Sequence, residues 1–328
     1  MAGRALAFSD AEIVRLAREE FVPVAMDDWY QRRRQDAEGR FFLGVADQGP
    51  RRGNGTRQGI YCFTAAGKLL VYKNAGQDPD VMREVFTEGL RKWRALPETE
   101  RRAGAVEVGE HGPLDARYAR PLPTDGATVR VFTRLLGRAG GAYVEAQSEP
   151  GKGNESARDH LWILPAEWRA LLRPGMKAGD VFPVPADLAA RIAQYHLVDN
   201  TRGEPPFWTR EQVREQEMAV KVLEVAGSRV RLQFTGRVFA STGAEAGGNA
   251  RGFDARLLGN VEVDSARPSL ERFDLVAVGE HWGNGPHTGG ERAGRTPMGV
   301  AFELADGKAP GDRVAPQGAR DWRDYIGK

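Results

Sequence analysis

The sequence predicts an α+β protein of two domains, the second built on an antiparallel β-sheet with a few helices. Three observations predict this. The 328 residues are 41% hydrophobic and 28% charged, which is ordinary for a globular chain long enough to form two cores. Helix-like and strand-like patterns mix up to residue 97, whereas strand-like alternation prevails over residues 127–328. Residues 98–126, between them, are rich in proline, glycine and charge and indicate a linker or draped segment.

Residues 1–97 contain short segments whose type follows from their spacing and their flanking residues. Ser9-Asp10 is a helix-capping pair, and Ala66-Gly67 is a turn signal between two runs of β-branched and aromatic residues. The expected elements, in order, are a helix at 11–21, a buried strand at 21–26, a helix carrying Phe41, Phe42 and Val45, a hairpin at 60–76 and a helix at 79–96.

Two stretches in this order, FVPVAMDDWY and IYCFTAAGKLLVYKNAG, carry a resemblance to the thioredoxin-like fold. The resemblance covers about residues 8–96 and implies a thioredoxin-like domain at residues 1–97. The sequence departs from the family at two points. Trp29 is followed by Tyr30, Gln31 and Arg32, where thioredoxin-like oxidoreductases carry CxxC, and no proline precedes Ile60. Because dithiol exchange needs two thiols, the domain is expected to lack that activity.

Composition excludes several classes of protein. The single cysteine, Cys62, excludes an intramolecular disulfide and CxxC zinc or redox sites. Its apolar neighbours predict an inert buried thiol, with a thiolate ligand or nucleophile as the alternative. The net charge of +2 does not indicate a nucleic-acid partner. No apolar run approaches the roughly 20 residues of a membrane span, and no glycine motif for a nucleotide cofactor is present. The partner expected is a small molecule or an unknown substrate.

The cellular compartment stays open. A single cysteine is compatible with the cytoplasm and with the periplasm. The start AGRALA resembles what remains after a leader is removed, so a periplasmic or secreted location is slightly favoured over a cytoplasmic one.

In the second domain, Pro165 and Pro185 each open a predicted helix, and a meander of strands begins at Met218. The clearest strand, near residues 229–240, places alternate residues on opposite faces. Its core face is expected to carry Val230, Leu232, Phe234, Gly236 and Val238, and its solvent face Arg229, Arg231, Gln233, Thr235 and Arg237. The tail ARDWRDYIGK is expected to form a short helix.

Histidines near the ends of these elements carry the chemical hypothesis. His160, His196 and His281 each stand within two residues of a tryptophan or tyrosine, and His281 begins a glycine-rich loop that also holds Trp282 and His287. Three neutral imidazoles fix a metal and leave an open position, so these three are the predicted ligands. Further candidates are His287 and a carboxylate, Glu280 or Asp199, completing a two-histidine, one-carboxylate triad. With one cysteine, the metal expected is copper, zinc or iron.

Three functions follow from these patterns. The leading one is a histidine-ligated metalloprotein that acts as an oxidoreductase. The first alternative is a non-catalytic binding or interaction protein with a redox-inactive thioredoxin-like scaffold, in which each histidine is a separate hydrogen-bonded residue. In that case the segment HLVDNTRGEPPFW, with Asp199, Arg202 and Glu204, reads as a binding loop or as a capped turn. The third is a metal-dependent hydrolase.

Overall fold

The chain divides into two compact units, residues 3–120 and residues 121–328. The computed structural model describes residues 8, 10–53, 55–74, 79–102, 112–118, 122–146, 156–243, 250–286, 288 and 294–326. The boundary falls inside the segment 98–126 that the sequence marks as a connector. Residues 112–118 of that segment are tied to the N-terminal unit, because Gln35 N donates to Asp115 and Asp115 N donates to Asp36.

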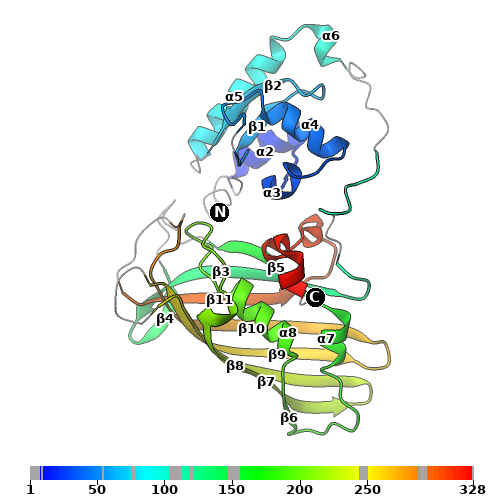
Figure 1. The fold of residues 1–328 in the computed structure, drawn as a ribbon, viewed down its shortest axis with the longest axis vertical. Helices are drawn as coiled ribbons and strands as arrows, with labels where there is room; N and C mark the ends of the chain where they lie inside the picture. The colour runs from blue at the N-terminus through cyan, green and yellow to red at the C-terminus, as the bar shows by residue number, and fades with distance from the viewer. Residues whose placement is uncertain are drawn as a thin grey trace. The chain divides into compact units, whose positions relative to one another are not determined.

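Short helices dominate the N-terminal unit, and aspartates start three of them. Side chains of Asp10, Asp27 and Asp36 accept hydrogen bonds from the first-turn amides that lack helical partners. The helices are α2 (Ala11–Glu20), α3 (Asp28–Gln31), α4 (Ala37–Ala46), α5 (Pro79–Arg94) and α6 (Glu98–Arg101) (Figure 1). The capped helix after Asp10 and the helix after Asp78-Pro79 agree with the sequence prediction.

The predicted hairpin is present as a two-stranded antiparallel sheet of β1 (Ile60–Phe63) and β2 (Leu69–Lys73). Gly67 turns between them at φ +80°, a conformation that favours glycine. Cys62 on β1 is buried in a small core with residues of two helices, namely Ile13, Met82, Val85 and Phe86. The prediction that this thiol lies in an apolar strand is therefore confirmed.

The strand predicted at residues 21–26 is not formed. The backbone there pairs with no strand of the described ranges, and Val22 and Val24 are 90% and 63% exposed. Pro23 removes one amide donor, and apolar composition alone does not supply a neighbouring strand. The thioredoxin-like resemblance, which relied on this segment as a core strand, stays a prediction.

The C-terminal unit contains one large antiparallel sheet, as the sequence predicts. Its strands are β3 (Ala127–Ala139), β4 (Ala142–Glu145), β5 (Ala157–Ile163), β6 (Val181–Pro183), β7 (Val213–Ala226), β8 (Arg229–Ser241), β9 (Gly252–Asp264), β10 (Ser269–Trp282) and β11 (Thr296–Leu304). The order is β4-β3-β11-β10-β9-β8-β7-β6, with β5 also paired to β3 (Figure 1). The strands after Met218 therefore form the predicted meander.

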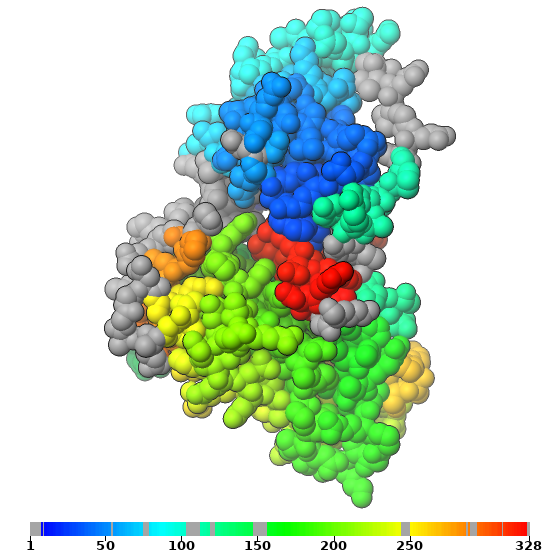
Figure 2. Space-filling view, viewed as in Figure 1, coloured from blue at the N-terminus to red at the C-terminus, as the bar shows by residue number. Residues whose placement is uncertain are grey.

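One face of this sheet forms the core. On β8, Phe234 and Val238 are buried while Arg231 and Arg237 are exposed, which confirms the predicted register. Helices α7 (Pro165–Arg169) and α8 (Ala186–Arg191), followed by a π-helical turn η1 (Ile192–His196), cover the core face. Figure 2 shows these segments and the C-terminal residues packed over much of the sheet in that view.

The end of the chain seals one edge of the core. Short 3₁₀ turns η3 (Pro310–Arg313) and η4 (Gln317–Arg320) lead to the helix α9 (Trp322–Ile326), as predicted for the tail. Tyr325 of α9 is 1% exposed and packs with Trp162 and Tyr195. Another 3₁₀ turn, η2 (Arg210–Gln212), precedes β7. No helix in the described ranges combines the length and the apolar character that crossing a membrane requires.

Candidate functional site

His281 lies at the end of β10, with its side chain on the core side of the sheet. Its Nδ1 lies 2.8 Å from the carbonyl oxygen of Thr296, its partner on β11. Because a carbonyl only accepts, Nδ1 carries the proton in this pair. The other ring nitrogen, Nε2, faces the guanidinium of Arg202 at 3.4 Å and Oδ2 of Asp199 at 3.7 Å.

Arg202 joins the loop after η1 to the end of β10. Its Nε donates to Asp199 Oδ2 at 2.6 Å, Nη1 donates to Asn284 Oδ1 at 2.9 Å, and Nη2 donates to the carbonyl of Gly283 at 3.2 Å. The side chain is 3% exposed. A planar guanidinium can hold these diverging acceptors at once, so Arg202 fixes the position of the loop relative to the strand.

Asp199 is held as a carboxylate by its neighbours. Burial alone would raise the pKa of this carboxyl, but the charge of Arg202, the His281 ring and the Thr201 hydroxyl together hold the pKa below its usual value. The amide and hydroxyl of Thr201 both donate to Oδ1, at 3.1 and 2.6 Å. Asp199 therefore starts the turn, as the capped-turn interpretation predicts, and it also pairs with Arg202.

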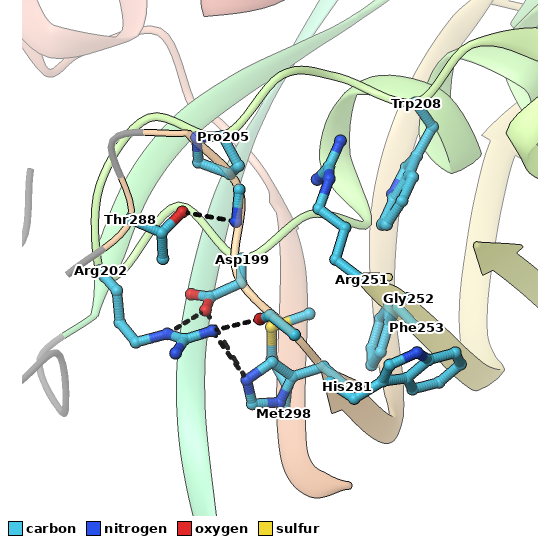
Figure 3. Close-up of a pocket in the computed structure, with 13 residues that line it drawn as sticks. Asp199, Arg202, Pro205, Trp208, Arg251, Gly252, Phe253, His281, Thr288 and Met298 are labelled. Carbon is cyan, nitrogen blue, oxygen red and sulfur yellow. Dashed lines mark hydrogen bonds and ion pairs between the residues drawn. The ribbon is translucent and has the colours of Figure 1, made fainter. Parts of the chain in front are cut away.

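A small pocket beside this group opens to solvent. Its interior holds about 20 Å³, and the roughly 290 Å³ of empty space there includes the solvent outside its mouth. Its apolar walls include Pro205, Trp208, Phe253 and Met298. Figure 3 shows the guanidinium of Arg251 next to the Trp208 ring, apart from the group formed by Asp199, Arg202 and His281. The distance from Arg251 Cζ to the Trp208 ring centre is 4.0 Å. The pocket therefore combines apolar walls with a few fixed polar groups, as small-molecule sites do.

His196 lies in a separate buried cluster under the C-terminal helix. Its Nε2 is 3.1 Å from the Tyr325 hydroxyl and its Nδ1 is 3.6 Å from Asp159 Oδ2. Burial, with smaller contributions from Arg191 and His160, lowers the pKa of His196 to about 3, while burial raises the pKa of Asp159 to about 6. His196 is therefore a neutral core residue that contacts α9.

His160 is half-buried on β5 and faces away from His196. Asp159, its neighbour, occupies the side of the strand that His196 approaches, because successive side chains alternate. Burial lowers the pKa of His160; nearby Asp312 opposes this shift and Arg130 adds to it. Arg130 pairs with Asp312 through two hydrogen bonds of 2.8 Å. His160 therefore lies beside the Arg130–Asp312 ion pair, which links β3 to η3.

The structure does not bring the three predicted ligands together. Asp159 lies in the row of Val131, Phe302 and Leu275 across β5, β3, β11 and β10. His196 belongs to this row too, since its ring is 6.4 Å from that of Phe302. His281 is six residues further along β10 than Leu275, which is about 20 Å at the usual rise of a strand. Bonds of about 2 Å to one metal cannot span this separation, so the set His160, His196 and His281 is wrong as a single site.

The additional candidates divide in the same way. Asp199 does lie beside His281, but Glu280 projects from the opposite face, where Tyr143 donates to it at 2.9 Å and Arg138 pairs with it. Trp282 also lies on that opposite face, over Gly252 and 6.0 Å from the Phe239 ring, so it does not cover His281. His287, like His111 of the connector, lies outside the described residues.

Within the described ranges, no three histidine, cysteine, aspartate or glutamate side chains are grouped as a metal site requires. The guanidinium of Arg202 also occupies the space in front of His281 Nε2. A histidine nitrogen that ligates a metal would need the metal ion in that space. The sequence analysis missed Arg251 and Trp208. Arg251 precedes a strand and Trp208 lies in a loop, and neither has a distinctive sequence pattern. The two stack although they are 43 positions apart in the sequence, and such a contact cannot be read from local spacing.

Comparisons with protein-family models, with curated proteins and with solved structures gave no match for this chain. The site is therefore interpreted from its geometry alone.

Proposed function

We propose that the C-terminal unit is a binding domain for a small molecule, which occupies the pocket between the loop 199–208 and the ends of β9, β10 and β11. This function belongs to the class of binding proteins, the alternative that the sequence offers to a metalloprotein. A single observation carries it. The pocket has apolar walls, and its polar side chains are fixed in place by contacts that do not need a ligand.

The polar side of the pocket is rigid. Arg202 has acceptors for Nε, Nη1 and Nη2, and His281 is oriented by the Thr296 carbonyl. Trp208, on the wall, is 5% exposed, and its indole N–H donates to the Leu197 carbonyl at 2.7 Å. A site that is already ordered loses little conformational entropy on binding, which favours the affinity of a small ligand.

The test uses three one-ring molecules that differ mainly in charge: benzoate, benzamide and benzylamine. At least one should bind the full chain in a ligand-observed NMR titration, with a Kd on the order of millimolar for a molecule of this size. The variant Gly285→Ala should weaken that binding several-fold, because the added Cβ would lie 2.9 Å from Pro205 Cβ in the pocket wall.

The matched control is Gly311→Ala, where an added Cβ meets nothing within 4 Å. It should bind as the wild type does. The proposal is wrong if none of the three molecules binds, or if the two alanine variants bind equally well.

The metalloprotein and the metal-dependent hydrolase stay predictions. Their test is elemental analysis of the purified chain for copper, zinc and iron, with His281→Ala as the variant. Stoichiometric metal that is lost in this variant would support them in place of the binding domain.

A further inference from the structure

Arg251 is held in the pocket by contacts on both its backbone and its side chain. Its amide donates to Thr242 Oγ1 at 3.0 Å, and its carbonyl accepts from the Thr242 amide at 3.0 Å. The guanidinium lies over Trp208, and Nη2 donates to the carbonyl of Pro206. The residue is 8% exposed. The position of this charge is therefore set by the protein before any ligand arrives.

Arg251 differs from the other arginines buried in this unit. Arg191 and Arg202 have side chains that are 1% and 3% exposed, and each pairs with a carboxylate, Glu167 at 2.8 Å and Asp199 at 2.6 Å. Among the described residues, Arg251 has one carbonyl acceptor for its five N–H groups and no carboxylate within ion-pair distance. Burying a cation without a counter-charge is costly, so this arrangement calls for an anion.

The charges around the pocket indicate how much negative charge a ligand should bring. Among the described residues, Asp199 is the acid whose charge acts on Arg251, and it opposes the effect by which burial lowers the pKa of Arg251 to about 10. However, Asp199 is already paired with Arg202. These two side chains balance each other, so among the described groups of the pocket the charge of Arg251 is the one left to be neutralised.

We propose that the ligand of this pocket is a small carboxylic acid whose carboxylate pairs with Arg251 and whose apolar part lies against Trp208, Phe253 and Met298. This inference rests on the proposed function, and it names the ligand class. A carboxylate brings one negative charge and two oxygens that match the fork of a guanidinium. The apolar walls favour an acid with a hydrocarbon substituent over a bare inorganic anion.

The first measurement needs no variant. In the wild-type chain, benzoate should bind roughly tenfold or more tightly than benzamide, because a hydrogen bond to a charged partner contributes more than one to a neutral partner. Benzylamine should bind most weakly, since its cation would face Arg251. Inorganic phosphate should bind more weakly than benzoate, because it lacks the apolar part.

The second measurement assigns the preference to Arg251. In Arg251→Gln, the roughly tenfold preference for benzoate over benzamide should disappear, whatever the change in the affinity for benzamide itself. Arg251→Lys keeps the charge without the fork and should retain part of the preference, so it serves as a second variant if the glutamine variant unfolds. The control is Arg231→Gln, which changes an exposed arginine paired with Glu224 on the other face of the sheet.

The outcomes separate this inference from the proposed function. Equal binding of benzoate and benzamide to the wild type would overturn the carboxylate and leave the binding pocket in place. Tighter binding of phosphate than of benzoate would overturn the carboxylate as well. A preference for benzoate that survives in Arg251→Gln would overturn the role of Arg251. Binding of benzylamine alone would overturn this inference and leave the binding pocket in place. If none of the three molecules binds, this inference and the proposed function both fall.

Discussion

The Nε atom of Arg202 donates to Oδ2 of Asp199 at 2.6 Å, and the two side chains are 3% and 10% exposed. This ion pair lies between the turn after η1 and the strand end that carries His281. A buried pair of this kind gains little over an apolar pair, but it is costly to break, because one charge is left without its partner. Arg202 is therefore expected to be essential for the shape of the pocket.

Replacing Arg202 by glutamine should lower the free energy of unfolding by about 3–5 kcal/mol. Arg202→Lys should recover only part of this loss, because an ammonium cannot reach Asp199, Asn284 and the Gly283 carbonyl together. Urea unfolding of the full chain measures both. The exposed Arg231→Gln is the control and should change stability by less than about 0.5 kcal/mol. A loss of unfolding free energy equal to that of the control would show that the Arg202–Asp199 pair does not stabilise the folded chain.

The sequence predicts the second unit better than the first because its strands alternate strongly. Val230 to Val238 reveal which face is buried, since a strand has a period of two. The run at residues 21–26 is apolar without alternation, and such a run forms a strand only where another strand is available to pair with it. No partner strand is evident in the sequence, so this element was predicted wrongly.

The candidate site was predicted in part. His281 at a strand end and Asp199 in a loop are candidates from local spacing alone. In the structure, His281 Nε2 lies 3.7 Å from Asp199 Oδ2. His196 and His160 were grouped with them because the sequence does not reveal strand order or register. The strand β11 lies between β10 and β3, and this long-range pairing carries His281 away from the other two. Arg251 has no local signal, since its role depends on Trp208.

The register of β8 gives a second prediction. Phe234→Ala should cost about 3–5 kcal/mol, because Phe234 is 1% exposed and packs 6.2 Å from the Phe273 ring. Arg231→Ala should cost little, since the Arg231–Glu224 pair is exposed on both sides. Thermal unfolding of the two variants compares them directly. Equal shifts in Tm would mean that the assigned faces of β8 are wrong.

Cys62 should react slowly with thiol reagents in the native protein. It is 5% exposed, and burial raises the pKa of its thiol to about 11, so little reactive thiolate forms at pH 8. An Ellman assay on native and urea-unfolded chain measures the difference, and labelling should follow unfolding. One equivalent of rapid labelling in the native state would instead support a reactive cysteine.

The buried pair of Asp159 and His196 should produce opposing effects of pH on stability. Because the pKa of His196 is about 3 in the folded chain and 6.5 normally, only the unfolded chain takes up this proton as pH falls below 6.5, and stability is lost. Because the pKa of Asp159 is about 6 in the folded chain and 3.8 normally, the folded chain takes up this proton between pH 6 and 3.8, and stability is gained.

Between pH 6 and 4 the two effects therefore cancel in the wild type. Asp159→Asn removes the gain and leaves the loss, so its stability should fall more steeply with decreasing pH, by roughly 1.4 kcal/mol per pH unit relative to wild type. Urea unfolding at pH 6, 5 and 4 measures this difference, in which other titrating groups cancel. Asp187→Asn changes an exposed carboxylate of the same unit and should run parallel to wild type. Parallel curves for Asp159→Asn and wild type would show that Asp159 binds no extra proton in the folded chain.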